Sequence, residues 1–146
     1  MTVVFDIDGT LTLVGNRVEE LEKTPKDWDA FYERCGEDDP NYPIVRILSD
    51  MKYSGNRIIL LTGRRESVRF QTEEWILGQG IHVGDLLLLM QKDGDFRHDT
   101  IVKPELLKEA GISLSDIDLV FEDRNSMVKF WRDNGVTCAQ VAEGNF

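Results

Sequence analysis

The stretch "MTVVFDIDGTLT" at residues 1–12 decides the fold. Residues 3–5 are an apolar run of the kind that builds a short buried strand. Because side chains alternate along a strand with a period of two, Asp6 and Asp8 lie on the same side of the chain where this strand ends. Two carboxylates held together repel each other unless a cation lies between them. The stretch therefore predicts a buried strand whose carboxyl end binds a cation.

Four further apolar runs predict the other strands of one sheet. Most of them are continuously apolar, which is typical of parallel strands that are buried on both faces. Helical patterns lie between the runs, and this alternation is typical of a doubly wound α/β fold. We therefore expect a mainly parallel, five-stranded sheet with helices on both faces and a small cap or none, folded as a single domain over residues 1–146. The four runs are 57–62, 85–90, 118–122 and 137–142.

The predicted helices differ in how clearly their ends are marked. Thr24 as N-cap and Pro25 at the first helical position start one helix. A second helix has an apolar stripe on one face and stops at Gly55. Residues 36–43 are expected to form a long loop. The stripe comprises Ile44, Ile47, Leu48 and Met51, and the other helices are expected within 65–80, 103–111 and 124–135.

Composition excludes several classes of function. The chain has 146 residues, of which 41% are hydrophobic, and a formal net charge of −10. This charge repels phosphate-rich partners and anionic membranes at long range, so an anionic ligand has to meet a local basic cluster. Cys35 and Cys138 lie far apart and form no disulfide framework or zinc motif. No run approaches the ~20 apolar residues of a membrane span, and the early aspartate disfavours a signal peptide, so we expect a cytoplasmic protein.

Acidic residues follow two of the predicted strands. Asp6 and Asp8 end the first, and Glu122 and Asp123 end the strand predicted at 118–122. The carboxyl ends of parallel strands share one edge of the sheet, where these residues would form an oxygen-rich site. A hard cation such as Mg²⁺ suits oxygen ligands better than a soft metal does.

Two aspartates with different neighbours also suit phosphoryl transfer. One carboxylate can attack phosphorus, while the other donates a proton to the leaving oxygen and later activates water. Thr62, at the end of another predicted strand, could hydrogen-bond a phosphate oxygen. Lys103 could neutralise the developing charge if the start of its helix points at the site.

The order of these motifs resembles that of the haloacid dehalogenase superfamily of phosphotransferases. The sequence contains DIDGT, then LTGR, then a lysine, and then an acidic pair after an apolar strand. The resemblance implies an α/β phosphatase that forms an aspartyl-phosphate and uses Mg²⁺. The implied roles are nucleophile for Asp6, acid and base for Asp8, phosphate binding for Thr62 and Lys103, and metal binding for Asp6, Asp8, Asp123 and Glu122.

A more extensive likeness is to the phosphatase domains of bacteriophage polynucleotide kinase/3′-phosphatases. It includes GNR, TGRRES, MQKDGDFRHDTIVK, FEDR and the final GVTCAQVAEGNF. It implies removal of 3′-phosphate from DNA or RNA ends in the cytoplasm of a phage host, with a separate kinase or ligase as a possible partner. Because the chain has no G-x-x-x-x-G-K-[ST] motif, we expect no 5′-kinase activity. The residues implied in substrate binding are Arg17, Arg64 and Asp99.

Some of these residues also have purely structural interpretations. Asp99 has the position of a cap for the helix that carries Lys103. An arginine after the LTGR motif, Arg65, is equally compatible with a solvated helix face. Trp28 and Tyr32 share a predicted helix face and could stack a base or pack in the core.

Two other functions compete with the leading hypothesis. A phosphatase of free nucleotides or other small phosphate esters would use the same chemistry. A signalling receiver domain also combines Mg²⁺, a phosphorylated aspartate, a threonine and a lysine. However, its phosphoaspartate normally lies on a later strand, and it lacks an acid two residues further on. Sustained turnover of p-nitrophenyl phosphate separates an enzyme, which cycles, from a receiver, which does not.

Overall fold

The first strand lies at the centre of the main sheet. In the computed structural model, which describes residues 1–145, β1 pairs in parallel with β4 on one side and β6 on the other. Strands β5 and β7 complete a five-stranded sheet in the order β5-β4-β1-β6-β7, with every pairing parallel. The expected α/β fold is therefore confirmed. The strands are β1 (Thr2–Phe5), β4 (Arg57–Arg65), β5 (Leu87–Gln91), β6 (Leu119–Arg124) and β7 (Cys138–Gly144).

Alternate side chains of the strands build two hydrophobic cores, one on each face of the sheet. Val3 and Phe5 belong to one core and Val4 to the other. Neighbouring residues of β4 divide in the same way, with Leu60 in the first core and Ile59 in the second. This two-sided burial is the reason that the strand sequences are continuously apolar.

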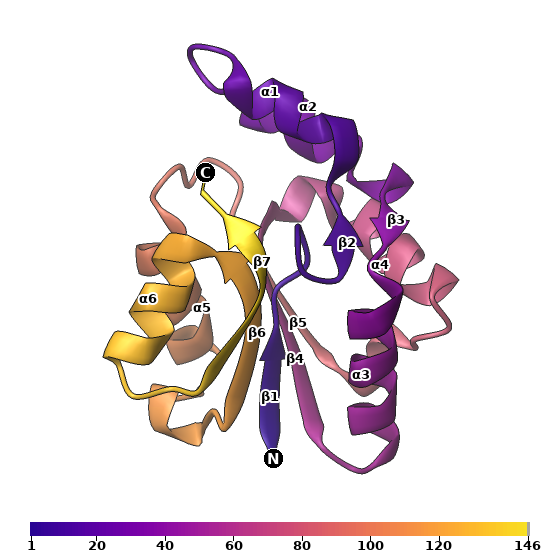
Figure 1. Ribbon diagram of the computed structural model, residues 1–146, viewed down its shortest axis with the longest axis vertical. Helices are drawn as coiled ribbons and strands as arrows, with labels where there is room; N and C mark the ends of the chain where they lie inside the picture. The colour runs from indigo at the N-terminus through magenta and orange to yellow at the C-terminus, as the bar shows by residue number, and fades with distance from the viewer. Residues whose placement is uncertain (146) are drawn as a thin grey trace.

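Helices cover both faces, as Figure 1 shows. Helices α3 and α4 lie on one side of the sheet, and α5 and α6 lie on the other. Trp75 of α4 is buried in the first core and Trp131 of α6 in the second. The four helices are α3 (Tyr42–Tyr53), α4 (Arg69–Gly78), α5 (Asp99–Glu109) and α6 (Asn125–Asp133).

The helix predicted to start at Thr24 starts instead at Trp28. The carboxylate of Asp27 accepts a hydrogen bond from the Ala30 N–H at 3.0 Å, so Asp27 is the N-cap. Thr24 therefore lies in the connection between two short helices. These are α1 (Glu19–Glu22) and α2 (Trp28–Glu33).

Two other local predictions also need correction. In α3, Val45 is buried, whereas Ile47, which was assigned to the apolar stripe, is exposed. The segment predicted as a long loop contains the strand β3 (Asp39–Pro40), which pairs antiparallel with β2 (Thr12–Leu13). This pairing holds the segment beside the chain that leaves β1, close to the predicted site.

The chain between β2 and β3 lies above the carboxyl ends of the central strands (Figure 1). It holds only α1, α2 and short helical turns, so no sizeable cap covers the sheet. Among residues 1–145, no helix combines the length and the apolar character that crossing a bilayer requires.

A glycine permits the tight turn after β1. Gly9 has a φ of +84°, in the left-handed region that side chains with a Cβ rarely adopt. A Cβ at this position would lie 2.1 Å from Oδ2 of Asp123. The chain can therefore pass this close to Asp123 only with glycine at position 9.

We expect Gly9→Ala to destabilise the fold. The backbone conformation alone costs a residue with a Cβ roughly 1–2 kcal/mol, and the overlap with Asp123 adds to this cost. The midpoint of thermal unfolding should fall by at least about 3 °C, measured by circular dichroism. Gly84→Ala is the control, since a Cβ there meets no atom within 4 Å, and its midpoint should stay within about 2 °C of wild type. Equal melting of the two variants would contradict this account.

Candidate active site

Three carboxylates meet at the carboxyl edge of the sheet. Asp6 follows β1, while Glu122 and Asp123 lie near the end of β6, and their ligand oxygens lie within 4.8 Å of one another. All three residues are buried. They meet because β1 and β6 are paired with Phe5 opposite Phe121, which places Asp6, just after β1, level with Glu122. This acidic trio offers the oxygen ligands that a hard divalent cation prefers.

A buried lysine contacts the acidic trio. Lys103 donates hydrogen bonds from Nζ to Oδ1 of Asp6 at 2.7 Å and to Oε2 of Glu122 at 2.9 Å. Its Nζ also lies 3.8 Å from Oδ2 of Asp99. Helix α5 begins at Asp99, so Lys103 lies one turn inside the helix and reaches the carboxylates through its long side chain.

Burial and mutual repulsion determine the protonation of these groups. Burial, together with the Glu122 carboxylate, raises the pKa of Asp6 well above its ordinary value, although Lys103 opposes the shift. Burial followed by repulsion from Asp6 raises the pKa of Asp123 to about 7. Burial alone would lower the pKa of Lys103, but the carboxylates of Asp6 and Glu122 raise it well above its usual range. The trio therefore has more acidic groups than Lys103 can neutralise, and a divalent cation would offset the excess.

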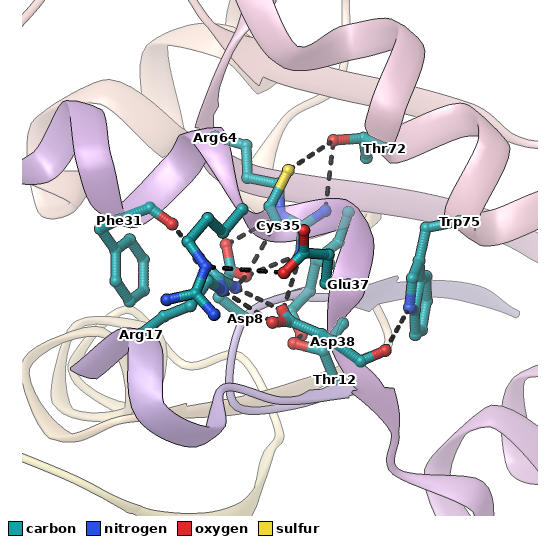
Figure 2. A network of polar contacts seen from close by, with 12 residues as sticks. Asp8, Thr12, Arg17, Phe31, Cys35, Glu37, Asp38, Arg64, Thr72 and Trp75 are labelled. Atoms are coloured by element: carbon teal, nitrogen blue, oxygen red, sulfur yellow. Dashed lines mark hydrogen bonds and ion pairs between the residues drawn. The ribbon is translucent and has the colours of Figure 1, made fainter. Parts of the chain in front are cut away.

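Asp8 contacts a different set of groups (Figure 2). Arg64 donates to its carboxylate from Nε at 3.0 Å and from Nη2 at 2.8 Å, and Arg17 donates from Nη2 at 2.7 Å. Burial would raise the pKa of Asp8, but these two guanidinium groups outweigh burial and lower it. Asp8 is therefore ionised at rest, and its carboxylate lies with the arginines, outside the acidic trio with which the sequence grouped it as a metal ligand.

The structure brings Arg17 to the site but buries it. The residue is 3% exposed, and its Nε donates to Oδ1 of Asp38 at 2.7 Å. It also donates to the carbonyl of Phe31, and its guanidinium lies 4.3 Å from the centre of the Phe31 ring. All three guanidinium nitrogens bond to protein groups, so Arg17 holds Asp8 and Asp38 in place. The substrate contact that the resemblance implied for Arg17 stays a prediction.

Asp38 belongs to this network, although the sequence analysis did not single it out. It accepts hydrogen bonds from Arg17 and, at 3.4 Å, from Nη2 of Arg64, and its side chain is 3% exposed. The only signal in the sequence is an acidic residue in a predicted loop, and its partner Arg17 lies 21 residues away. Pairing of β2 with β3 brings the two together.

The other predicted residues also lie at this edge. The hydroxyl of Thr62 accepts a hydrogen bond from the Arg64 N–H at 3.1 Å, and the intervening Gly63 lines the cavity beside Asp6 and Asp8. Asp99 does not cap α5, because His98 occupies the N-cap position. The carboxylate of Asp99 pairs instead with Nη1 of Arg124 at 3.0 Å. Like Asp38, Arg124 had no role predicted from the sequence.

The parallel sheet with buried acids at its carboxyl edge has the fold of haloacid dehalogenase-like proteins. L-2-haloacid dehalogenase from Xanthobacter autotrophicus shares this fold, with a TM-score of 0.68 and 12% sequence identity over 96% of this chain and 76% of that chain. The chain itself belongs to the family of polynucleotide kinase PNKP phosphatase domains, which it matches over residues 1–146. The predicted resemblance is thereby confirmed.

Two solved structures share more sequence with this chain. A chain in the Pnkp1/Rnl/Hen1 complex is 32% identical, with a TM-score of 0.80, over 99% of this chain and 47% of that chain. A chain in the Pnkp1/Rnl/Hen1 RNA repair complex is 31% identical, with a TM-score of 0.79, over 99% of this chain and 43% of that chain. The present chain thus spans less than half the length of either relative.

We expect Asp38→Ala to destabilise the protein strongly. The change leaves two buried guanidinium groups, those of Arg17 and Arg64, with one carboxylate in place of two. Removing one partner of a buried ion pair lowers the free energy of unfolding by about 3–5 kcal/mol. Urea unfolding would measure this loss. Asp50→Ala is the matched control, because the pair of Asp50 with Arg46 is exposed and contributes about 0.3–0.5 kcal/mol. A loss at position 38 no larger than that at position 50 would refute the role given to Asp38.

We expect Mg²⁺ to raise the midpoint of thermal unfolding more at pH 8 than at pH 6. The pKa of Asp123 is about 7 in the folded protein, against ~3.9 in the unfolded chain. Its favourable contribution to the free energy of unfolding is therefore complete below pH ~3.9 and is lost as the pH rises through 7. A cation that binds the ionised trio offsets this loss and competes with protons at lower pH. Mg²⁺ at a concentration of 100 times its dissociation constant would add about 2.7 kcal/mol to the free energy of unfolding.

Calorimetry with Mg²⁺ or EDTA at the two pH values measures this difference. Asp123→Asn should reduce the increase that Mg²⁺ causes, because it removes one candidate ligand. An increase of equal size at both pH values would contradict the protonation state assigned to Asp123.

Proposed function

We propose that this chain is a Mg²⁺-dependent phosphatase that removes 3′-phosphate groups from polynucleotide ends through an aspartyl-phosphate on Asp6. One observation carries the proposal. Asp6 and Asp8, two residues apart, have opposite surroundings: Asp6 contacts Lys103 and lies in the acidic trio, whereas Asp8 is held by two arginines. Two carboxylates with different environments suit two different roles in one reaction. Membership in the PNKP phosphatase family supports the choice of reaction.

Covalent transfer assigns each carboxylate a step. An oxygen of Asp6 attacks phosphorus, and the bond from phosphorus to the 3′ oxygen breaks. The leaving oxygen takes a proton from Asp8, which later removes a proton from the water that hydrolyses the aspartyl-phosphate. Since Asp8 is ionised at rest, the proton that it donates has to arrive with the substrate or from solvent.

Charge stabilisation falls to Lys103 and the acidic trio. Lys103 lies 2.7 Å from the attacking carboxylate and can neutralise charge that develops on the transferred phosphoryl group. Asp6, Glu122 and Asp123 would hold Mg²⁺, which when bound screens the repulsion between the nucleophile and the anionic ester. The carboxylate of Asp8 would join them as a ligand only by leaving its arginines. Phosphate binding by Thr62 remains a prediction.

A free nucleotide is the second candidate substrate. The cavity at Asp6 and Asp8 is small, about 20 Å³, so any substrate group larger than the phosphoryl group has to lie outside it. Any phosphate ester that fits there would therefore satisfy the catalytic groups. Contacts outside this cavity have to distinguish a polynucleotide end from a mononucleotide.

The setting of the reaction is proposed by analogy. One similar structure is described as an RNA repair complex, and a phosphatase that leaves 3′-hydroxyl ends prepares them for a ligase. We propose that a separate ligase or kinase acts on the same ends. A bacteriophage origin and a cytoplasmic location remain predictions.

A substrate panel tests the proposed function. It compares oligonucleotides that carry a 3′-phosphate, a 5′-phosphate or a 2′,3′-cyclic phosphate with mononucleotides, each with Mg²⁺ or EDTA. We expect release of phosphate from the 3′-phosphorylated oligonucleotide, only with Mg²⁺, and with a kcat/KM at least about 10-fold above that of any other substrate, or roughly 1.4 kcal/mol. A preference for mononucleotides would favour the second candidate.

Asp6→Asn should abolish turnover of the preferred substrate. The amide keeps the shape of the side chain but removes the attacking oxygen, so phosphate release should fall at least about 1,000-fold while the circular dichroism spectrum stays that of wild type. Asp118→Asn is the control, because Asp118 accepts an exposed hydrogen bond from the Thr2 N–H at the opposite end of β1. Residual activity above a few per cent in Asp6→Asn would rule out the covalent route.

A further inference from the structure

We infer that a second cavity beside the catalytic groups binds the terminal nucleoside of the substrate, with its base between Trp28 and Phe96 and its backbone phosphate at Arg65. The inference depends on the proposed function, and it identifies the contacts that distinguish a polynucleotide end from a simple phosphate ester. We call this space the nucleoside cavity. It lies between α2 and the chain that precedes α5.

The nucleoside cavity is continuous with the catalytic one. Trp28, Tyr32, Asp99 and Arg124 line both. The volume of the nucleoside cavity is about 170 Å³, below the roughly 300–1,000 Å³ of pockets for drug-sized ligands. A group joined to a phosphoryl held at Asp6 would therefore pass directly into a space suited to one ring system.

Aromatic side chains from two parts of the chain line this space. Trp28 and Tyr32 on α2 stack on each other, with ring centres 5.9 Å apart and planes 24° apart. Phe96, which comes from the chain before α5, is 76% exposed, so little of its surface packs against the protein. From the sequence alone, Trp28 and Tyr32 could stack a base or pack in the core. Their position on the cavity wall favours stacking, because any base can lie against an aromatic face.

The lining is positively charged, although the chain is acidic. Arg65, Arg97 and Arg124 contribute three positive charges and Asp99 one negative charge, a sum of +2 in a chain whose net charge is −10. The nucleoside cavity thus provides the local basic cluster that an anionic ligand of this protein requires. A phosphodiester next to the terminal nucleoside would match it.

Arg65 lines this wall and contacts both Asp29 and Phe96. Its guanidinium pairs with Asp29 and lies 4.6 Å from the ring centre of Phe96. Its buried Nε has no hydrogen-bond partner among the described residues, and an unpaired buried donor is unfavourable. All three arginines of the lining have carboxylate partners: Arg65 pairs with Asp29, Arg97 pairs with Asp95 and Glu105, and Arg124 pairs with Asp99. Asp29 is the most exposed of these carboxylates, at 75%, and exposed ion pairs are weak, so Arg65 is the cation best placed to exchange its partner for a phosphate oxygen.

The test uses Asp6→Asn as the background, with Mg²⁺, so that substrate binds without turnover. Fluorescence anisotropy measures the dissociation constant of a 5′-labelled oligonucleotide that ends in a 3′-phosphorylated nucleoside, and of the same oligonucleotide with an abasic terminal sugar. Adding Phe96→Ala should weaken binding of the normal end at least about 5-fold and of the abasic end less than about 2-fold. Phe70→Ala, which removes a ring that is 71% exposed on α4, is the matched control and should weaken neither.

Salt dependence tests Arg65 separately. In Arg65→Gln, the slope of log K against log salt should become less negative by about 0.7, the value for one phosphate contact on a single strand. Arg65→Lys should retain most of the wild-type slope, because it keeps the charge. Arg46→Gln, which removes an exposed arginine of α3, should leave the slope unchanged. Thermal unfolding verifies that each variant is folded.

The outcomes separate the inference from the proposed function. If the wild-type enzyme releases no phosphate from 3′-phosphorylated oligonucleotides, both fail. If it does, but Phe96→Ala behaves like Phe70→Ala or weakens normal and abasic ends equally, only the nucleoside cavity is refuted. A slope in Arg65→Gln equal to that of Arg46→Gln would refute the phosphate contact.

Discussion

The contact of Lys103 with Asp6 and Glu122 is the interaction on which the site depends. Each of these groups is buried, and a buried ion pair is tolerated only when its geometry is good and further hydrogen bonds satisfy its polar atoms. The contact joins three elements: β1 through Asp6, β6 through Glu122 and α5 through Lys103. Parallel pairing of β1 with β6 fixes the distance between the carboxylates, and α5 packs so that the lysine reaches both.

The chain between β2 and β3, which lies above the sheet, positions the carboxylate of Asp8. Arg17 and Asp38 lie in this segment and, together with Arg64 from β4, hold the Asp8 carboxylate away from the acidic trio. The two aspartates of one motif are thereby given opposite pKa shifts by opposite neighbours. A small segment held by the pairing of β2 with β3 can position a carboxylate in this way without forming a separate cap domain.

The sequence correctly predicted the features that depend on neighbouring residues and on regular strand geometry. The period of two placed Asp6 and Asp8 after a buried strand, and parallel strands necessarily bring their acidic ends to one edge. It did not predict contacts between residues that are distant along the chain. Burial of Arg17 depends on Asp38, 21 residues away, and on pairing of β2 with β3, two strands of two residues each that leave almost no signal in the sequence. The helix start failed for a different reason: Thr24 and Asp27 are both good caps, and only tertiary packing selects between them.

The central claim is that phosphate passes through a covalent bond to Asp6, and trapping that bond tests it most directly. The enzyme would be mixed with 3′-phosphorylated oligonucleotide and Mg²⁺, quenched in acid within milliseconds, and reduced with borohydride, which converts an aspartyl-phosphate to homoserine. Peptide mass spectrometry should then find homoserine at position 6, only when substrate is present. Homoserine at another aspartate, or its absence at every time point during rapid turnover, would contradict the account.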